Sequence, residues 1–263
     1  MTNNEQDQPV RKTWIMLKKA APEYATEGLT MHFCGEDGYV GNNWVSRINP
    51  NDKLNAWYSK YKPTYNAEGK YYQSYTQTGY QRGYAYGFRS NFSLTTSENF
   101  AFEIVTRNIK AIRAVVSGNH AYVAAGNCGS QYGNWTPPKG SVVLRKFNEG
   151  GGTDYSNYNK INLYIQGDTN IYKKHVDEFA DDSLDTFTIV PGQGLYHNGV
   201  KVSECGVVEG TTLMGIMQTY MSYETTYTSA NRCKVHAVRV YNRKLTDDEI
   251  LKNHKKDILV YGG

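Results

Sequence analysis

The chain has 263 residues, enough for one large domain or two small ones, and all-β sandwiches of this size often form a single domain. Its formal net charge of +4 is small, and its lysines and arginines are interspersed with acidic residues, which argues against nucleic-acid binding. The 25 glycines and the scarcity of long helical patterns indicate a turn-rich β protein. No stretch approaches the length of an apolar membrane span, so we expect neither nucleic acid nor a membrane as a partner.

Residues 1–25 are predicted to form a polar N-terminal arm, and residues 26–263 a single domain. The arm contains only a five-residue apolar patch at 13–17, which is too short for the core of a signal peptide. A free polar tail of this kind would normally fray. For the arm to be ordered, another part of the fold or a partner subunit must contact it, and we expect such a contact.

The domain is predicted to open with a strand and a glycine-rich loop within Gly28–Asn49. A tyrosine-rich excursion follows at about residues 51–86, and the spacing of its rings fits neither a helix nor a strand. Two interpretations stay open. The rings cover the core and anchor a long loop, or they form a contact surface for sugars or protein partners.

Regular strand signals follow this excursion. The predicted strands are short apolar or alternating runs at 100–106, 111–116, 121–125, 141–147, 161–166, 171–176, 186–190, 194–197, 200–202, 212–218 and 235–240. Asn198-Gly199, between two of these runs, is the strongest short hairpin signal in the chain. Many short strands with few helices predict a β-sandwich.

The stretch Cys233–Asp257 is predicted to be a buried strand, a corner and a short helix. Thr246 and Glu249 have the spacing of a capping box, and Leu245 and Ile250 that of a hydrophobic staple. Acidic residues occupy the first turn, and the end of the predicted helix carries Lys252, Lys255 and Lys256, as the helix dipole favours. We expect the staple to pin the helix against a rim of the sandwich.

This stretch resembles the end of laminin-G-like domains of the concanavalin-A-like lectin/glucanase superfamily. The residues that carry the resemblance run from Val238 to Ile250 (VRVYNRKLTDDEI) and are followed by Asn253 and Asp257. The strand Phe100–Thr106 and the hairpin around Asn198-Gly199 are similar to other strands of these domains. The resemblance implies an all-β, two-sheet antiparallel jelly-roll sandwich with a short C-terminal helix.

The beginning of the domain also resembles this family, with one departure. Positions that fit the family pattern are Gly28, Leu29, His32, Phe33, Gly35 and Trp44. The Asp that usually follows the Trp is absent, and Ser46 and Arg47 stand near its place. Any structural role of that Asp is therefore in doubt in this chain.

No motif for catalysis is present in the sequence. The glucanases of this fold carry E-x-D-x-E on one strand, which places carboxylates on one face, and no such run occurs here. The acidic cluster at 177–182 falls between strands and is typical of a solvated turn, and the six histidines are isolated. We therefore expect no enzymatic activity.

We also expect no cofactor. Many relatives in this family use calcium, and loop oxygens could come from Asp154, Asn157, Asn159 and Asp168, but these residues have no ligand spacing and suit turns. The cysteines at 34, 128, 205 and 233 form no C-x-x-C pair, which predicts buried reduced thiols rather than a metal site. A single disulfide stays open.

Two loops combine aromatic rings, amides and glycines, at 127–140 and 148–160. Their candidate contact residues for a glycan or another partner are Tyr132, Asn134, Trp135, Asp154, Tyr155, Tyr158 and Asn159. Flat rings can stack on sugars and planar amides can bind hydroxyl groups, and loops on a rigid sandwich often carry binding function. Ordinary turn chemistry under an aromatic lid explains the same residues equally well.

The resemblance implies display outside a cell, because domains of this family are mostly found there, whereas no secretion signal is evident. Assembly in the bacterial cytoplasm followed by lysis would reconcile the two. We expect a non-enzymatic phage virion protein, a capsid-decoration or tail/fibre component that contacts other virion subunits through its N-terminal arm and binds host or mucosal glycans. The alternatives are an extracellular glycan-binding module or adhesin of a bacterial surface protein, and a polysaccharide hydrolase or lyase.

Overall fold

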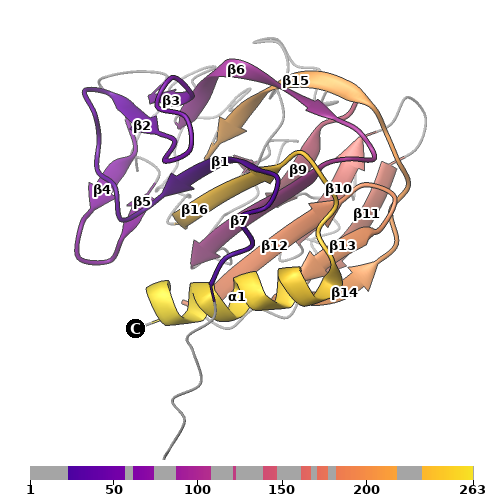
Figure 1. The fold of residues 1–263 in the computed structure, drawn as a ribbon. Coiled ribbons are helices and arrows are strands. Elements are labelled where there is room, and N and C mark those ends of the chain that lie inside the picture. The colour runs from indigo at the N-terminus through magenta and orange to yellow at the C-terminus, as the bar shows by residue number, and fades with distance from the viewer. Residues whose placement is uncertain are drawn as a thin grey trace, which may run out of the picture.

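The computed structural model describes residues 23–56, 62–73, 87–107, 121–122, 139–146, 161–166, 171–176, 182–217 and 233–262 (Figure 1). Within these residues the chain forms sixteen strands and one helix: β1 (Leu29–Cys34), β2 (Asn43–Val45), β3 (Lys53–Ala56), β4 (Thr64–Asn66), β5 (Tyr71–Gln73), β6 (Phe88–Thr96), β7 (Ala101–Arg107), β8 (Ala121–Tyr122), β9 (Val142–Lys146), β10 (Ile161–Gln166), β11 (Ile171–Val176), β12 (Leu184–Val190), β13 (Gly194–His197), β14 (Val200–Ser203), β15 (Gly210–Ile216), β16 (Lys234–Tyr241) and α1 (Asp247–Tyr261).

The strands form two layers, and every described strand pair is antiparallel. One layer is a large eight-stranded sheet in the order β14-β13-β12-β7-β16-β5-β4, with β1 also paired to β16. The other layer consists of two four-stranded sheets, which we call the first small sheet (β15-β6-β3-β2) and the second small sheet (β11-β10-β9-β8). This architecture confirms the predicted all-β sandwich with a C-terminal helix.

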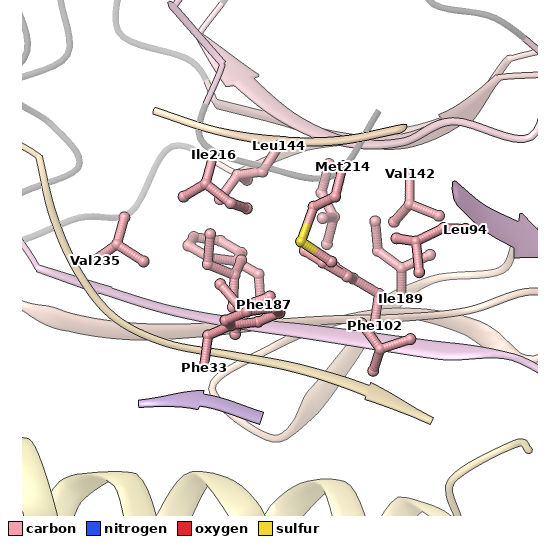
Figure 2. Packing of buried hydrophobic residues seen from close by; sticks show 14 of the residues in the cluster. Phe33, Leu94, Phe102, Val142, Leu144, Phe187, Ile189, Met214, Ile216 and Val235 are labelled. Carbon is pink, nitrogen blue, oxygen red and sulfur yellow. The ribbon is translucent and has the colours of Figure 1, made fainter. Parts of the chain in front are cut away.

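The hydrophobic core lies between the two layers. Figure 2 shows Phe102 and Phe187 of the large sheet opposite Met214 of the first small sheet and Leu144 of the second. All four side chains are at most 1 % exposed to solvent. Both small sheets therefore share one core with the large sheet, and burial of its apolar surface is the main force that holds the sandwich together.

The central strands of the large sheet are buried on both faces. Alternate residues of β7, such as Phe102 and Ile104, enter the core, and the intervening Glu103 is also fully buried. Side chains alternate between the two faces of a strand, so something must cover the outer face as well. That cover is α1, which runs beneath the strands of the large sheet in Figure 1.

Strand β16 occupies the centre of the large sheet. It pairs with β7 along one side, and on the other side with β1 and then with β5. Gly35 lies where β1 ends, and its N–H donates to the carbonyl of His236 at 2.6 Å. A Cβ at this position would lie 2.1 Å from the carbonyl oxygen of Lys70, so this close passage of three backbones requires glycine.

The capping box of α1 is present as the sequence predicts. The Thr246 hydroxyl accepts from the backbone N–H of Glu249 at 3.2 Å, and the Glu249 carboxylate accepts from the N–H of Thr246 at 2.9 Å. Leu245 and Ile250 are fully buried in one apolar cluster beside the outer face of the large sheet.

Two details of the helix prediction are wrong. The helix continues beyond Asp257 to Tyr261, so the three lysines lie before its last turn, which contains no basic residue. The helix also lies across the outer face of the large sheet rather than against a rim, because its buried polar side chains reach the central strands β7, β12 and β16.

Most predicted strands after residue 100 are present, and their boundaries agree with the prediction or differ by one or two residues, while the predicted end of the strand at 121–125 lies outside the described residues. The Asn198-Gly199 hairpin joins β13 to β14, and both turn residues have positive φ, 52° and 80°, as a type I′ turn requires. The sequence reading missed β2 to β6. The predicted strand at 111–116 lies outside the described residues.

Candidate functional site

The most polar buried centre in the described chain lies between the large sheet and α1. The guanidinium of Arg239 on β16 donates two hydrogen bonds to the carboxylate of Asp257 on α1, at 2.8 and 2.7 Å. Its Nε donates to the carboxylate of Glu103 on β7 at 3.0 Å. All three side chains are fully buried. We call them the Arg239 cluster.

Neighbouring polar groups satisfy the remaining oxygens of this cluster. Asp257 accepts from the hydroxyls of Tyr24 at 2.9 Å and Thr186 at 3.1 Å. Glu103 accepts from the Thr188 hydroxyl at 3.0 Å and from the Asn253 amide at 2.7 Å. Such complete pairing is what allows charged groups to persist in a protein interior.

The first described residues of the chain close the cluster. The ring of Tyr24 lies over the guanidinium of Arg239 at 4.4 Å, and the N–H of Ala25 donates to Asn253 at 2.8 Å. Burial raises the pKa of Glu103, opposed by the neighbouring Arg239. Since no atom of the three charged side chains reaches solvent, this centre fastens the helix and the start of the domain to the sheet and cannot meet a substrate.

The Arg239 cluster gives a physical role to residues of the C-terminal motif. Arg239, Asn253 and Asp257 stand in that motif, and all three contact one another or Glu103 under α1. Glu103 is the partner that the sequence reading missed. The sequence offered one signal for Glu103, which is that it is the only charged residue in the largely apolar strand at 100–106.

The loop after β1 is also organised by internal contacts. Trp44 is fully buried, and its indole N–H donates to the carbonyl of Cys34 at 3.0 Å. Ser46, near the place of the missing Asp, accepts from the backbone N–H of His32 at 3.2 Å. Arg47 pairs with Asp37 at 2.6 Å on the surface. Ser46 thus supplies a buried oxygen that binds the backbone at this corner.

The tyrosines in the described part of the excursion cover the core. Tyr72 is fully buried, and its hydroxyl donates to the carbonyl of Asp37 at 3.0 Å. Tyr65 packs beside it, with ring centroids 4.9 Å apart, and donates to the carbonyl of Glu36 at 3.2 Å. These two rings support the anchoring interpretation. The other rings of the excursion, apart from the half-buried Tyr71, lie outside the described residues.

Two histidines are buried without a full set of partners. Nε2 of both His32 and His236 has no hydrogen-bond partner among the residues that the structure describes. Burial lowers the pKa of His32 to about 3 and that of His236 to about 4. Both rings are therefore neutral at physiological pH. The ring of another histidine, His197, lies 2.7 Å from the carboxylate of Asp185 on β12. That carboxylate also accepts from the Asn198 amide, and so links β12 to the β13–β14 hairpin.

In the part of the chain that the structure describes, no group of three or more His, Cys, Asp or Glu side chains could hold a metal ion. Cys34, Cys205 and Cys233 are buried free thiols, as the sequence predicts for them. Among these same residues, no helix has the length and apolar character needed to cross a membrane.

All seven predicted contact residues, from Tyr132 to Asn159, lie outside the described residues. The structure does show where their loops are attached. Residues 123–138 return to the chain at Lys139, just before β9, whereas residues 147–160 leave from the other end of that strand. A five-residue strand is about 13 Å long at roughly 3.3 Å per step. Residues 123–138 begin, however, after Tyr122, which is paired with Arg145 near that same end of β9, so one end of each group is attached close to the other. The convergence of the candidates on one site stays a prediction.

Comparisons with known proteins identify similar folds but no family for this chain. No family model matches it, and a search of curated proteins found no match. Thus the laminin-G-like resemblance has no support from a family model, although the observed sandwich is compatible with a lectin-like fold.

Several solved structures are similar. Trypanosoma rangeli sialidase in complex with sialic acid matches 89% of this chain and 33% of its own, with a TM-score of 0.52 and 14% identity. The binding domain of Paraclostridial Mosquitocidal Protein 1 matches 86% of this chain and 52% of its own, with a TM-score of 0.54 and 12% identity. The receptor binding domain of botulinum neurotoxin D matches 88% and 53%, with a TM-score of 0.52 and 11% identity.

These neighbours define a class, a β-sandwich of the kind found in toxin binding domains and in part of a sialidase. The chain spans between a third and about half of their lengths, and at such low identity the likeness shows the fold alone. The comparison also corrects the expectation of a non-enzymatic protein. Because an enzyme shares this fold, the missing glucanase motif is no ground for excluding catalysis.

Proposed function

We propose that this chain is a carbohydrate-binding module. The observation that carries the proposal is its sandwich fold, which is shared with a toxin binding domain and with a neurotoxin receptor-binding domain. The Arg239 cluster supports it, because that cluster fastens helix to sheet and makes a rigid platform from which loops can present contact residues.

The sequence of the loops agrees with this function. The two connections on either side of β9 contain the rings and amides that sugar sites use, Tyr132, Asn134 and Trp135 in one and Asp154, Tyr155, Tyr158 and Asn159 in the other. The buried charged groups of the Arg239 cluster are instead engaged in internal contacts. We therefore assign ligand contact to the loops and structural support to the sandwich.

A glycan array with the purified chain tests the proposal directly. We expect selective binding to a subset of glycans, and loss of that binding in Trp135→Ala or Tyr155→Ala, depending on which loop carries the site. Thr246→Ala is the control, since it weakens the helix cap and leaves the loops unchanged. A chain that binds no glycan refutes this function, and binding that survives both loop substitutions refutes the assignment of the contact residues to the loops. Release of reducing sugar from the bound glycans, measured in parallel, would identify a hydrolase instead.

We retain a place on a phage particle only as a secondary proposal, because the similar structures named above favour a binding module without pointing to a virion. Contacts of the N-terminal arm with other virion subunits, and release by lysis, belong to this proposal. Immunogold labelling of purified particles tests it: absence of label on virions would leave the extracellular binding module as the better assignment.

A further inference from the structure

Two buried histidines lie on the outer face of the large sheet, which α1 covers (Figure 1). His236 on β16 contacts the end of the helix, where its ring centroid is 5.0 Å from that of Tyr261. His32 on β1 contacts the first described residues of the chain, and its ring centroid is 5.7 Å from that of Tyr24. Both rings therefore lie where α1 and residues 23–25 are attached to the sheet.

The charged form of neither ring would find acceptors for all its hydrogens. Nδ1 of His236 lies 3.0 Å from the backbone carbonyl of Lys70, which can only accept, so this nitrogen carries the hydrogen of the neutral ring. In both His32 and His236, Nε2 is buried and has no hydrogen-bond partner within the described structure. An imidazolium carries a hydrogen on each nitrogen. Its Nε2–H would be a buried and unpaired donor on a charged group, which is costly.

The charges around the two rings also oppose a further positive charge. The charged groups of the described chain that face them are Arg47, Arg239 and Glu36 around His32, and Arg107, Lys234 and Asp182 around His236. In each case two cations outnumber one carboxylate. Glu36 already pairs with Arg47 at 3.2 Å, and Asp182 with Lys234 at 3.3 Å. The aromatic neighbours add no negative charge in acid; they are Tyr24, Tyr71 and Tyr261.

Departure of the helix would uncover both rings. The ring that packs on His236 is Tyr261, which is part of α1 itself. The ring that packs on His32 is Tyr24, whose hydroxyl donates to Asp257 of the same helix at 2.9 Å. Loss of the helix therefore removes one cover directly and the anchor of the other. Water could then solvate a proton on either histidine.

We propose that the attachment of α1 is acid-sensitive: as the pH falls, protonation of His32 and His236 favours an open state in which the helix and residues 23–25 have left the outer face of the large sheet. In the closed state the pKa is about 3 for His32 and about 4 for His236, whereas an imidazole in water has a pKa of about 6.5. Only the open state therefore binds these protons between about pH 6.5 and 4. The closed state is fully favoured above about pH 6.5, and below it each histidine reduces this advantage about tenfold per pH unit. Glycan binding is not part of this inference.

Hydrogen–deuterium exchange of the whole chain, measured by mass spectrometry at pH 7.0 and 5.5, tests the proposal. Peptides from α1 report the attachment of the helix, and peptides from β7 and β12 report the sandwich. Each exchange rate is divided by the intrinsic rate at its pH. The test variant combines His32→Phe with His236→Gln. The first change keeps a ring beside Tyr24, and the second keeps an N–H donor for the carbonyl of Lys70.

His197→Gln is the matched control, since it also removes one histidine. The ring of His197 lies 2.7 Å from the carboxylate of Asp185, so a proton on this ring gains a partner in the closed state. Its loss should leave the acid response of α1 in place. The lower pH of 5.5 is above the ordinary pKa values of Asp and Glu, so most carboxylates stay charged throughout the comparison.

We expect the protection of α1 in the native chain to fall about a hundredfold from pH 7.0 to 5.5, about tenfold for each histidine, while β7 and β12 keep theirs. The control should show the same fall, and the test variant should change by less than about threefold. A native chain whose helix protection changes by less than about threefold overturns the inference. A test variant with the full response, a control without it, or an equal loss of protection in β7 and β12 overturns it as well.

Thermal melting shows whether each variant is folded. If the double variant unfolds, the two single variants replace it, each with an expected fall of about tenfold, half of the native response on a logarithmic scale. The response of the native chain requires no variant, so its absence is decisive in every case.

Discussion

Removal of the Asp257 carboxylate should destabilise the protein strongly. In Asp257→Ala, the fully buried guanidinium of Arg239 loses two of its hydrogen bonds, and the hydroxyls of Tyr24 and Thr186 lose their acceptor. Breaking a buried ion pair by removal of one partner costs about 3–5 kcal/mol. For a domain of this size, about 2–4 °C per kcal/mol corresponds to a fall in Tm of about 6–20 °C.

Equilibrium unfolding in urea and differential scanning calorimetry measure this loss. Asp248→Ala is the matched control, because Asp248 is exposed in the first turn of the same helix and should contribute only about 0.3–1 kcal/mol through the helix dipole. Asp257→Asn separates the effect of charge from that of volume, because it keeps the shape of the side chain. Its NH2 group would face N–H and O–H donors, with which it cannot form a hydrogen bond as an acceptor. We expect it to be nearly as destabilising as the alanine variant. A loss below about 1 kcal/mol in Asp257→Ala would refute the reasoning about the buried charge.

Three further predictions concern the helix cap and the centre of the sheet. Thr246→Ala should cost about 1 kcal/mol in urea unfolding and leave glycan binding unchanged; equal stability would argue against the cap. Arg243 lowers the pKa of Glu249 from 4.5 to about 2, so this pair should stabilise the fold fully above pH 4.5 and lose its effect as the pH falls toward 2. Thermal melts of Glu249→Gln should lack this component, and a pH profile parallel to that of the native chain would contradict it. Gly35→Ala should cost about 1–3 kcal/mol or more, because the new Cβ meets two backbone carbonyls, whereas Gly41→Ala, with no atom within 4 Å, should cost only the roughly 1–2 kcal/mol of its positive φ. Similar losses in the two glycine variants would show that crowding at residue 35 is not the cause.

Local signals in the sequence were sufficient for the parts of the fold that local interactions determine. The capping box joins Thr246 and Glu249, three residues apart, and the turn at Asn198-Gly199 requires only its own two residues to adopt positive φ. Both were predicted correctly. The sandwich also follows from the succession of short strands, because their apolar faces must be buried against another layer.

The features that were missed depend on residues far apart in the chain. Glu103 and Arg239 are separated by 136 residues, so nothing near Glu103 in the sequence indicates its partner. Strands β2 to β5 have only three or four residues each, too few to show an alternating pattern among tyrosines and asparagines. Of the candidate site, the sequence could supply residue types in loops. It could not supply the pairing of β8 with β9, which brings the start of residues 123–138 close to the start of residues 147–160.

The central place of β16 has a consequence for the order in which the protein can fold during synthesis. Strand β1 leaves the ribosome long before the strand it is paired with, β16, because the two are separated by most of the domain's sequence. The edge of β7 that β16 covers must wait equally long. The large sheet therefore cannot close until β16 has been made, and contacts so distant in sequence form slowly. Until then, two unpaired strand edges remain open to pairing with other chains, and a chain that stops before residue 234 would keep them open permanently.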